Sequence, residues 1–564
     1  MIMKEQYDVA ILGGGLAGLT LAMQLKKNQP KISIVVLEMR KNACPDSAHK
    51  VGESTVELGT YYLREVLGLS DYLDKNQLPK QGLRFYFSPQ VKTEIDKRVE
   101  LGPKDSLPIP SHQIDRGTFE NDLISMLSDL GIDICLGARI KDIEFNKEGH
   151  YLYYTNQGIS KDLRSNWIVD ATGRAAFVKR KLGFEKTLDH NINAIWFRVK
   201  GEIDVDNWSE NMDWREKLKP GFRRLGTVHF MGKGYWVWLI PLASGNTSVG
   251  IVADPNYHDF SELNKFDKAM EWLNINEPLC AEKLNPYRDA LMDFRVLKHY
   301  AHDSGRFYST DKWGVVGEAG AFLDPFYSPG TDFIALGNTW VTDLILRDFS
   351  GEDIASRSII YERVHATFFQ SWVPIYQNQY SLFGNTQVMV VKILWDWGVY
   401  WSIPTLLFTN NGFININILR ALFTTRNSLG DRLGKLNIRV QKFFQDWASS
   451  ENNTHINGYI DFFDIPFLKK MHIEMDIKHS EESLIAKCEE NLKVLEEMAA
   501  EIFRTVSGRI KGTPEDMKIN PYEFSFVMSN EELLINAQSE KAIDTRSSIS
   551  SEMKIMWLEE KLMV

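Results

Sequence analysis

Cysteine is scarce in this chain of 564 residues, and no two of the four cysteines form a C-x-x-C pair: Cys44, Cys135, Cys280 and Cys488. This spacing excludes a cysteine-based zinc site and a disulfide framework as organising features. It fits a reducing compartment, and we expect a cytoplasmic protein. Only MIMKEQ precedes the strand-like YDVAIL, so we expect no signal peptide.

Positive charge and long hydrophobic runs are also limited. The net charge of −10 argues against a general nucleic-acid binder. The most apolar run of the later chain covers residues 388–408, and Lys392, Asp396 and Pro404 interrupt it. We therefore predict a buried helix followed by a turn rather than a membrane span. The functional alternative for this run is a wall of a substrate tunnel.

Aromatic side chains, by contrast, are plentiful, at 12% with 15 tryptophans. Such a content suggests large aromatic-lined surfaces or a planar ligand. The stretch GYWVWLIP at 234–241 alternates like a strand with one buried face, which places Trp236 and Trp238 on the same side. Taken alone, it is equally consistent with a structural pair packed on a core.

The N-terminal segment YDVAILGGGLAGLTLAMQLKK predicts a strand, a tight turn and a helix, with Gly13, Gly15 and Gly18 in a G-x-G-x-x-G pattern. Gly13 allows the turn, Gly15 lets the backbone approach a pyrophosphate, and Gly18 lets helix and strand pack closely. A second strand, ISIVVLE, ends in Glu38, which suits a ribose hydroxyl. These features predict a dinucleotide site at the amino end of the helix.

Two later segments favour FAD over NAD as the dinucleotide. VDATGR at 169–174 reads as a strand ending in Asp170 and a small-residue turn. In WGVVGEAGAFLDPFYSPG, Glu318 follows Gly317 where a ribose or ribityl hydroxyl could be accepted. Gly330 precedes a helix and offers backbone N–H donors to a flavin edge or an anion.

Together, these segments resemble the flavin-dependent halogenases, which are FAD monooxygenases with a Rossmann-type, p-hydroxybenzoate-hydroxylase-like FAD domain. The resemblance spans roughly residues 5–345 and rests on GGGLAG (13–18), VGEST (51–55), QIDRGTFENDL (113–123), VDATGR (169–174), WVWLIP (236–241) and GEAGAFLDPFYSPG (317–330). Many FAD enzymes share the glycine-rich parts, so W-x-W-x-I-P is the discriminating one.

The resemblance implies a chemistry. In that family, reduced FAD and O2 give a C4a-hydroperoxide that oxidises chloride or bromide, and hypohalous acid passes through a tunnel to a lysine. The lysine relays the halogen to an electron-rich aromatic substrate, free or tethered to a carrier protein, and a separate flavin reductase supplies the reduced cofactor. Lys80, just before the strand GLRFYF, matches that lysine. In an apolar tunnel its pKa would be depressed. Without the resemblance, Lys80 is one loop lysine among many.

The resemblance also assigns further roles. Gly52, Glu53 and Ser54 would shape the flavin pocket, and Arg116 would contact the diphosphate or adenosine, unless it is a surface arginine at a helix start. Backbone N–H groups of Gly330 and Thr331 would hold the halide, and Trp236 and Trp238 would line the channel and keep the substrate from the flavin. The full set of cofactor residues that we expect, with no metal, is Gly13, Gly15, Leu16, Ala17, Gly18, Glu38, Gly52, Glu53, Ser54, Arg116, Asp170, Gly317, Glu318, Pro325 and Gly330.

Two departures from the family pattern stand out. The tryptophan halogenases carry a glutamate where this chain has Tyr327, which points towards phenol-like or pyrrole-like substrates because these need no such base. Glu57 stands where the family commonly has proline. We expect Glu57 to be a surface helix residue; the alternative is an altered tunnel entrance.

The expected fold is therefore α/β, in three parts. Residues 1–80, 113–175 and 310–348 form a discontinuous FAD-binding domain, 81–112 and 176–309 an antiparallel substrate sheet, and 349–564 a mostly helical region without a family match. Competing functions are an aromatic hydroxylase that reduces its own FAD with NAD(P)H, a flavoprotein like geranylgeranyl reductase or lycopene cyclase, and a non-catalytic binding protein. A monomer and a homodimer are both compatible with the sequence.

Overall fold

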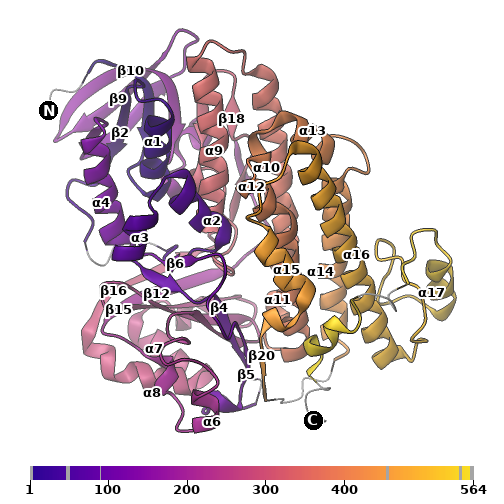
Figure 1. Cartoon of the computed structure of the whole chain (residues 1–564). Helices are drawn as coiled ribbons and strands as arrows, with labels where there is room; N and C mark the ends of the chain where they lie inside the picture. Colours follow the sequence, from indigo (N-terminus) through magenta and orange to yellow (C-terminus); the bar gives the residue numbers. More distant parts are fainter. Residues whose placement is uncertain (1–3, 46–50, 89, 452–456, 545–548, 559–564) are drawn as a thin grey trace.

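The computed structural model describes residues 4–45, 51–88, 90–451, 457–544 and 549–558 (Figure 1). Its first sheet contains parallel strands in the spatial order β19, β10, β1, β2 and β7 (Trp313–Val315, Ile159–Asp170, Gln6–Leu12, Ile34–Glu38 and Asp133–Leu136). Helices α1 (Leu16–Asn28), α4 (Arg116–Asp129) and α9 (Gly330–Phe349) pack beside it. Because parallel strands end at one edge, the loops after β1, β2, β10 and β19 converge there.

The second sheet has the order β16, β12, β15, β14, β13, β4, β5 and β20 (Leu291–Lys298, Asn193–Lys200, Asn246–Ala253, Tyr235–Pro241, Thr227–Gly232, Leu83–Phe87, Val99–Leu101 and Gly458–Ile460). The strands expected from GLRFYF and GYWVWLIP are confirmed as β4 and β14. Most pairings are antiparallel, but β13–β4 and β5–β20 are parallel. β20 belongs to the later chain, so that region contributes a strand as well as helices.

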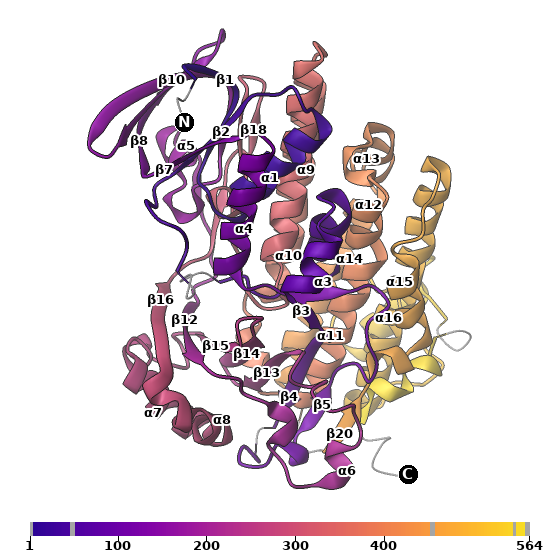
Figure 2. The same cartoon turned by 60° about the vertical axis from the view of Figure 1, so that its left-hand side comes forward.

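Strand β14 carries the two tryptophans on one face, as its alternation predicts. Trp236 and Trp238 belong to the core shared with the first sheet, whereas Tyr235 and Val237 belong to a second core on the opposite face. Helices α7 (Phe266–Asn276) and α8 (Pro278–Leu284) cover that opposite face, and the sequence analysis did not predict them (Figure 2). Both faces of the strand are buried.

The later chain forms a layer of helices beside both sheets, including α10 (Ala355–Tyr376), α11 (Thr386–Tyr400), α14 (Leu429–Ala448), α15 (Pro466–Glu474) and α16 (Glu481–Lys511) (Figure 1). Every residue of α11 is buried, as expected for a helix that is mostly apolar all round; its charged residues Lys392 and Asp396 pair with each other. A π-helical turn, Trp401–Thr405, follows it and contains Pro404. The buried helix and turn predicted over 388–408 are confirmed.

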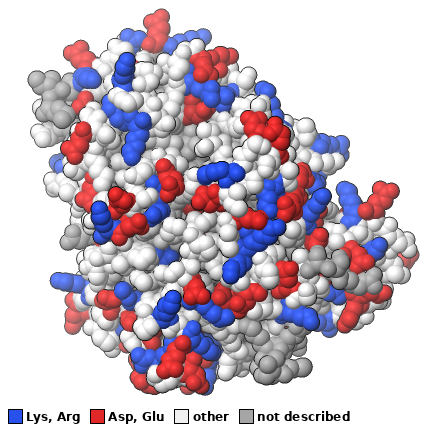
Figure 3. Space-filling view, in the orientation of Figure 1, with Lys and Arg blue, Asp and Glu red and all other residues white. Residues whose placement is uncertain are grey.

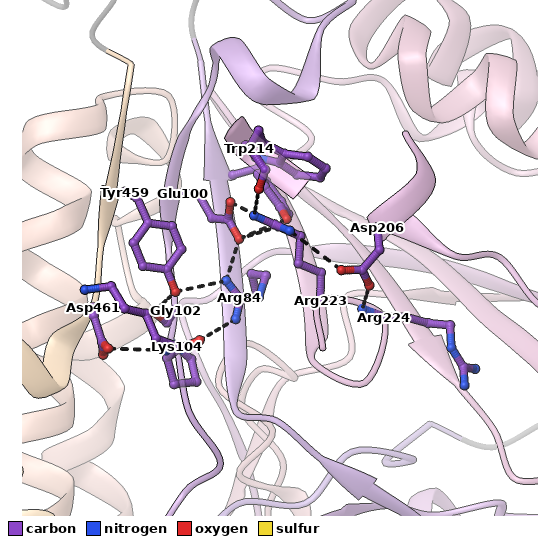
Figure 4. Close-up of polar contacts among 12 residues, drawn as sticks. Arg84, Glu100, Gly102, Lys104, Asp206, Trp214, Arg223, Arg224, Tyr459 and Asp461 are labelled. Carbon is purple, nitrogen blue, oxygen red and sulfur yellow. Dashed lines mark hydrogen bonds and ion pairs between the residues drawn. The ribbon is translucent and has the colours of Figure 1, made fainter. Parts of the chain in front are cut away.

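A buried group of charges joins β20 to the second sheet (Figure 4). Arg223 Nε lies 3.0 Å from Glu100 Oε1, and Arg84 pairs with the same carboxylate. Tyr459 of β20 donates a hydrogen bond of 2.8 Å to the carbonyl of Gly102. Because a buried charge without a partner is costly, this network favours one docking position for β20.

The distribution of charged side chains on the surface agrees with the small net charge of the sequence. On the face shown in Figure 3, basic and acidic side chains are interspersed rather than gathered by sign. In the described part of the chain, none of the helices has both the length and the apolar character needed to cross a membrane.

Candidate active site

The loops at the carboxyl edge of the first sheet enclose an elongated nucleotide pocket. Glycine lets them approach: a Cβ on Gly13 would lie 2.3 Å from the carbonyl oxygen of Ala171, and one on Gly18 would lie 2.0 Å from the carbonyl oxygen of Gly13. Gly13 also has a φ of +106°, which side-chain-bearing residues rarely adopt. The helix α1 begins after Gly15 without a side-chain cap, which leaves its first N–H groups for a ligand.

Most of the predicted cofactor and halide residues line this pocket: Gly13, Gly15, Leu16, Ala17, Glu38, Gly52, Arg116, Gly317, Glu318, Gly330 and Thr331. The space between the walls is about 1300 Å³, its opening included. Glycine backbone, an uncapped helix end, two carboxylates and a guanidinium are the groups that a flavin dinucleotide needs. The residues present therefore fit FAD.

Glu38 and Arg116 are held in place at the pocket wall. Glu38 Oε2 accepts a hydrogen bond of 2.7 Å from the N–H of Gly14. Arg116, at the start of α4, lies 2.6 Å from Glu120 Oε1 and donates 2.8 Å to the carbonyl of Val51. Arg116 is 8% exposed, so the alternative of a solvated surface arginine is wrong.

Some predicted residues lie away from the nucleotide pocket. Gly18 packs helix against strand, and the Asp170 carboxylate accepts hydrogen bonds from the N–H groups of Thr172 (2.9 Å) and Val178 (2.7 Å), which fixes the turn after β10. Residues of the same turn line the pocket instead, together with others that sequence reasoning missed: Ala171, Thr172, Gly173, Arg174, Trp196, Leu297, Phe322 and Phe333. The segment VDATGR signals the first four, whereas no local pattern signals the rest.

A second pocket adjoins the first, and we call it the tryptophan pocket. Its lining includes Glu53, Ser54, Thr227, His229, Trp236, Trp238, Pro325 and Ser328, and it shares Val51, Gly52, Phe322 and Gly330 with the nucleotide pocket. The indoles of Trp236 and Trp238 lie 5.5 Å apart between ring centroids. Trp236 Nε1 donates 3.0 Å to the hydroxyl of Tyr380, which in turn donates 2.8 Å to Asp324. The later chain thus fixes the orientation of Trp236.

Lys80 ends the short strand β3 (Leu78–Lys80) and lines a third pocket, which we call the lysine pocket. It is 3% exposed, so it is not a solvated loop lysine. Its Nζ donates 2.6 Å to the carbonyl of Thr55. Burial lowers the pKa of Lys80 to about 7, although the charges of Glu57 and Asp332 act in the opposite direction.

The prediction that Glu57 is a surface helix residue is wrong. Glu57 begins α2 (Glu57–Tyr61), is 6% exposed, and lines the lysine pocket. Its Oε1 lies 3.1 Å from Nε2 of His472 on α15, because the helical region covers α2. Burial alone would raise the pKa of Glu57, but the hydrogen bond and charge of His472 outweigh burial, and the pKa is lowered.

A second carboxyl group, Asp332, lies beside Lys80 and was not predicted. It accepts hydrogen bonds from the N–H of Gly59 (2.8 Å) and the hydroxyl of Tyr400 (2.9 Å). Burial raises the pKa of Asp332 to about 8. Its only sequence signal is an acidic residue next to Gly330 and Thr331 at the start of a helix.

The rest of the lysine pocket is a mainly apolar, aromatic wall from the helical region, and its space is about 1240 Å³ with its opening. The run 388–408 contributes Asp396, Trp397, Val399, Tyr400, Trp401, Ile403, Pro404 and Leu407, which confirms that it forms a pocket wall. Helix α10 adds Phe368 and Trp372, which no sequence pattern marked. Tyr327 also lines this pocket, and its hydroxyl donates 2.9 Å to Asp396 Oδ2.

Comparison with known proteins gives consistent results. Residues 6–258 match the family model described as an FAD binding domain. The chain is 29% identical over 434 residues to the flavin-dependent halogenase chlA of Dictyostelium discoideum, covering 71% of this chain and 70% of that protein. It is 25% identical over 407 residues to the 1H-pyrrole-2-carbonyl-[peptidyl-carrier protein] chlorinase of Pseudomonas fluorescens, covering 67% and 84%. The structure of halogenase PltM with phloroglucinol and FAD superposes with a TM-score of 0.66 at 15% identity, covering 86% and 96%.

The fold, the nucleotide pocket and the family model define an FAD-binding protein of the oxidoreductase class. Within that class, the chain is a homologue of the flavin-dependent halogenases, as its sequence motifs predicted.

Proposed function

We propose that this protein is a flavin-dependent halogenase that acts on an electron-rich aromatic substrate of the phenol or pyrrole kind. The observation that carries the proposal is the placement of Lys80, a buried lysine with a pKa near 7 in a pocket that shares no lining residue with the nucleotide pocket. An oxidant made at one site and used at another needs such a group at the second site. The pyrrole-2-carbonyl group named for the chlorinase and the phloroglucinol bound to PltM support the substrate class.

FAD would occupy the nucleotide pocket. We assign its pyrophosphate to Gly13, Gly15 and the amino end of α1, and a ribose hydroxyl to Glu38. The flavin would lie towards Gly52 and Gly330, where the nucleotide and tryptophan pockets meet. Reduced FAD supplies, with O2, the oxidising chemistry that converts chloride or bromide to hypohalous acid, and we expect a separate flavin reductase to reduce it.

The residues where the nucleotide and tryptophan pockets meet would control which molecules reach the flavin. Backbone N–H groups of Gly330 and Thr331 at the start of α9 would hold the halide, because the positive end of a helix attracts anions. Trp236 and Trp238 would exclude the organic substrate from the flavin while leaving passage for a small oxidant. Their role is exclusion, not acid or base catalysis.

Lys80 would then hold and deliver the halogen. Since its pKa is about 7, its ammonium and amine forms are both populated near neutral pH. The ammonium form donates a hydrogen bond to hypohalous acid, and the amine form has a lone pair that bonds to halogen. The carbonyl of Thr55 orients Nζ, and an aromatic carbon in the same pocket attacks the halogen.

The decisive experiment combines the FAD-loaded protein with a flavin reductase, NADH, chloride or bromide, and phenols, pyrroles and indoles, free and carrier-tethered. Mass spectrometry should detect the halogen isotope pattern in a phenol or pyrrole product. Hydroxylated product, with steady NAD(P)H oxidation by the protein without the reductase, would instead establish the hydroxylase. Consumption of an isoprenoid without halide would instead establish a flavoprotein like geranylgeranyl reductase or lycopene cyclase.

We also place the protein in the cytoplasm. Cys44, Cys135, Cys280 and Cys488 are all buried thiols, which suits a reducing compartment.

A further inference from the structure

The loop before α9 separates two pockets by an unusual backbone. Tyr327 and Ser328 are consecutive residues in the left-handed region, with φ of +69° and +61°. Neither is glycine, and such strain persists only where the surrounding structure fixes it. The turn sends the Tyr327 side chain to the lysine pocket, while Ser328 lines the tryptophan pocket.

The hydroxyl of Tyr327 is one of the contacts that hold this backbone. It donates 2.9 Å to Asp396 Oδ2, and Asp396 is itself held by Lys392 Nζ (2.9 Å) and Gln441 Nε2 (2.6 Å). Lys392 and Gln441 are fully or almost fully buried, at 0% and 1% exposure. The position of the carboxylate is therefore set from three directions.

This arrangement decides whether the Tyr327 hydroxyl can donate or accept a hydrogen bond in the pocket. Burial, and then the charge of Asp396, raise the pKa of Tyr327 far above its ordinary value, so the phenol keeps its proton. That single proton is committed to Asp396. Among the described residues, no donor reaches the hydroxyl oxygen, which leaves it as a hydrogen-bond acceptor in the pocket that contains Lys80.

We propose that Tyr327 determines substrate specificity by accepting a hydrogen bond from a ring-attached O–H or N–H of the aromatic substrate, and that Asp396 positions it for that task. The inference rests on the proposed function and deepens it. A substrate without a donor would leave the buried oxygen unpaired, so the pocket selects donor-bearing rings over their methylated analogues.

The same contact favours the reaction. A phenol or pyrrole that donates a hydrogen bond to an acceptor gains electron density in its ring. The ring carbon attacks the halogen, the bond from the halogen to Lys80 Nζ breaks with its electron pair left on nitrogen, and that amine takes up the proton that the ring carbon loses. Tyr327, which stands where the tryptophan halogenases carry a glutamate, would thus lie between the substrate and the carboxylate of Asp396 on α11.

Binding to the oxidised, FAD-loaded protein tests the proposal without requiring turnover. Calorimetry should give the Kd of phloroglucinol, of its trimethyl ether, of pyrrole-2-carboxamide and of its N-methyl derivative. Tyr327→Phe should weaken binding of the two donors by about tenfold or more and change the methylated partners by less than about twofold. The phenol and pyrrole pairs show which donor the site takes.

Tyr376→Phe is the matched control. Tyr376 is a buried neighbour whose hydroxyl donates 3.1 Å to the carbonyl of Phe326, and it is not part of the pocket lining. The Tyr376→Phe substitution should leave all four Kd values unchanged. Equal losses for donor and methylated ligands in Tyr327→Phe, or no loss, would overturn the proposal. Absence of halogenation by a protein that still discriminates the ligands would instead count against the proposed function.

Discussion

Glu57 Oε1 lies 3.1 Å from Nε2 of His472, a residue 415 positions further along the chain. The pair connects the helical region to the surroundings of Lys80, since Glu57 lines the same pocket and its charge raises the pKa of the lysine. The helical region therefore supplies more than an apolar wall, because it fixes a charge beside the proposed halogen carrier.

Replacing Glu57 by glutamine should shift the pH dependence of halogenation. Burial lowers the pKa of Lys80, and Glu57 offsets part of that effect, so its removal lowers the pKa further. We expect the midpoint of the pH–rate profile to move to lower pH by about one unit, measured at saturating reduced FAD. Glu65→Gln, an exposed change in the same helical segment, should leave the profile in place. An unmoved midpoint in Glu57→Gln with normal FAD content would show that this charge does not reach Lys80.

Lys80→Met should abolish halogenation while sparing the cofactor. Methionine keeps the length of the side chain and removes the nitrogen, so product formation should fall at least about a hundredfold. FAD binding and release of hydrogen peroxide should continue, since Lys80 does not line the nucleotide pocket. Lys75→Met, on the exposed face of α3 (Ser70–Asn76), is the matched control. Full activity in Lys80→Met would remove the lysine from the mechanism.

The same variant should raise stability at neutral pH. The folded-state pKa of Lys80 is lowered from 10.5 to about 7, so between these values the unfolded chain binds a proton that the folded chain excludes. The wild type is thus destabilised as pH falls from 10.5 towards 7. Lys80→Met escapes this cost but loses the contacts of Nζ, so its net gain in stability at pH 7 is on the order of 2 kcal/mol. Lys80→Met should melt about 2 °C higher at pH 7, and this advantage should be lost above pH 10.5, where only the missing contact of Nζ separates the two proteins. A constant difference across this range would contradict the buried lysine.

The features that sequence reasoning predicted are local ones. Gly13 and Gly18 are constrained by contacts within a strand, turn and helix, and the alternation around Trp236 and Trp238 specifies one face of one strand. Lys80 was assigned by its place just before the strand GLRFYF, where the family pattern puts a lysine, and not by any property of its own.

The features that were missed depend on the packing of distant segments. Whether Glu57 is exposed depends on where α15 docks, and no sequence motif in the region 349–564 predicts that position. Asp332 is one of three aspartates of α9 and Asp396 is the only acidic residue of α11, and only the folded chain shows that both reach the pocket of Lys80. Helices α7 and α8 cover a sheet face whose alternation was read correctly, but a strand pattern does not reveal what covers it.

Gly330 offers a test of where the flavin lies. A Cβ on Gly330 meets no protein atom within 4 Å, and Gly330 lines both the nucleotide and the tryptophan pocket. Gly330→Ala should therefore fold normally, with apo-protein stability unchanged or raised by up to about 1 kcal/mol at this helix start. The added methyl would project into the space assigned to the flavin, so FAD affinity should fall about tenfold in fluorescence titrations of the apo-protein. Gly458→Ala, also free of contacts within 4 Å but on β20, should bind FAD as the wild type does. If Gly330→Ala binds FAD and uses halide with wild-type constants, the flavin and halide do not lie at the junction of the two pockets.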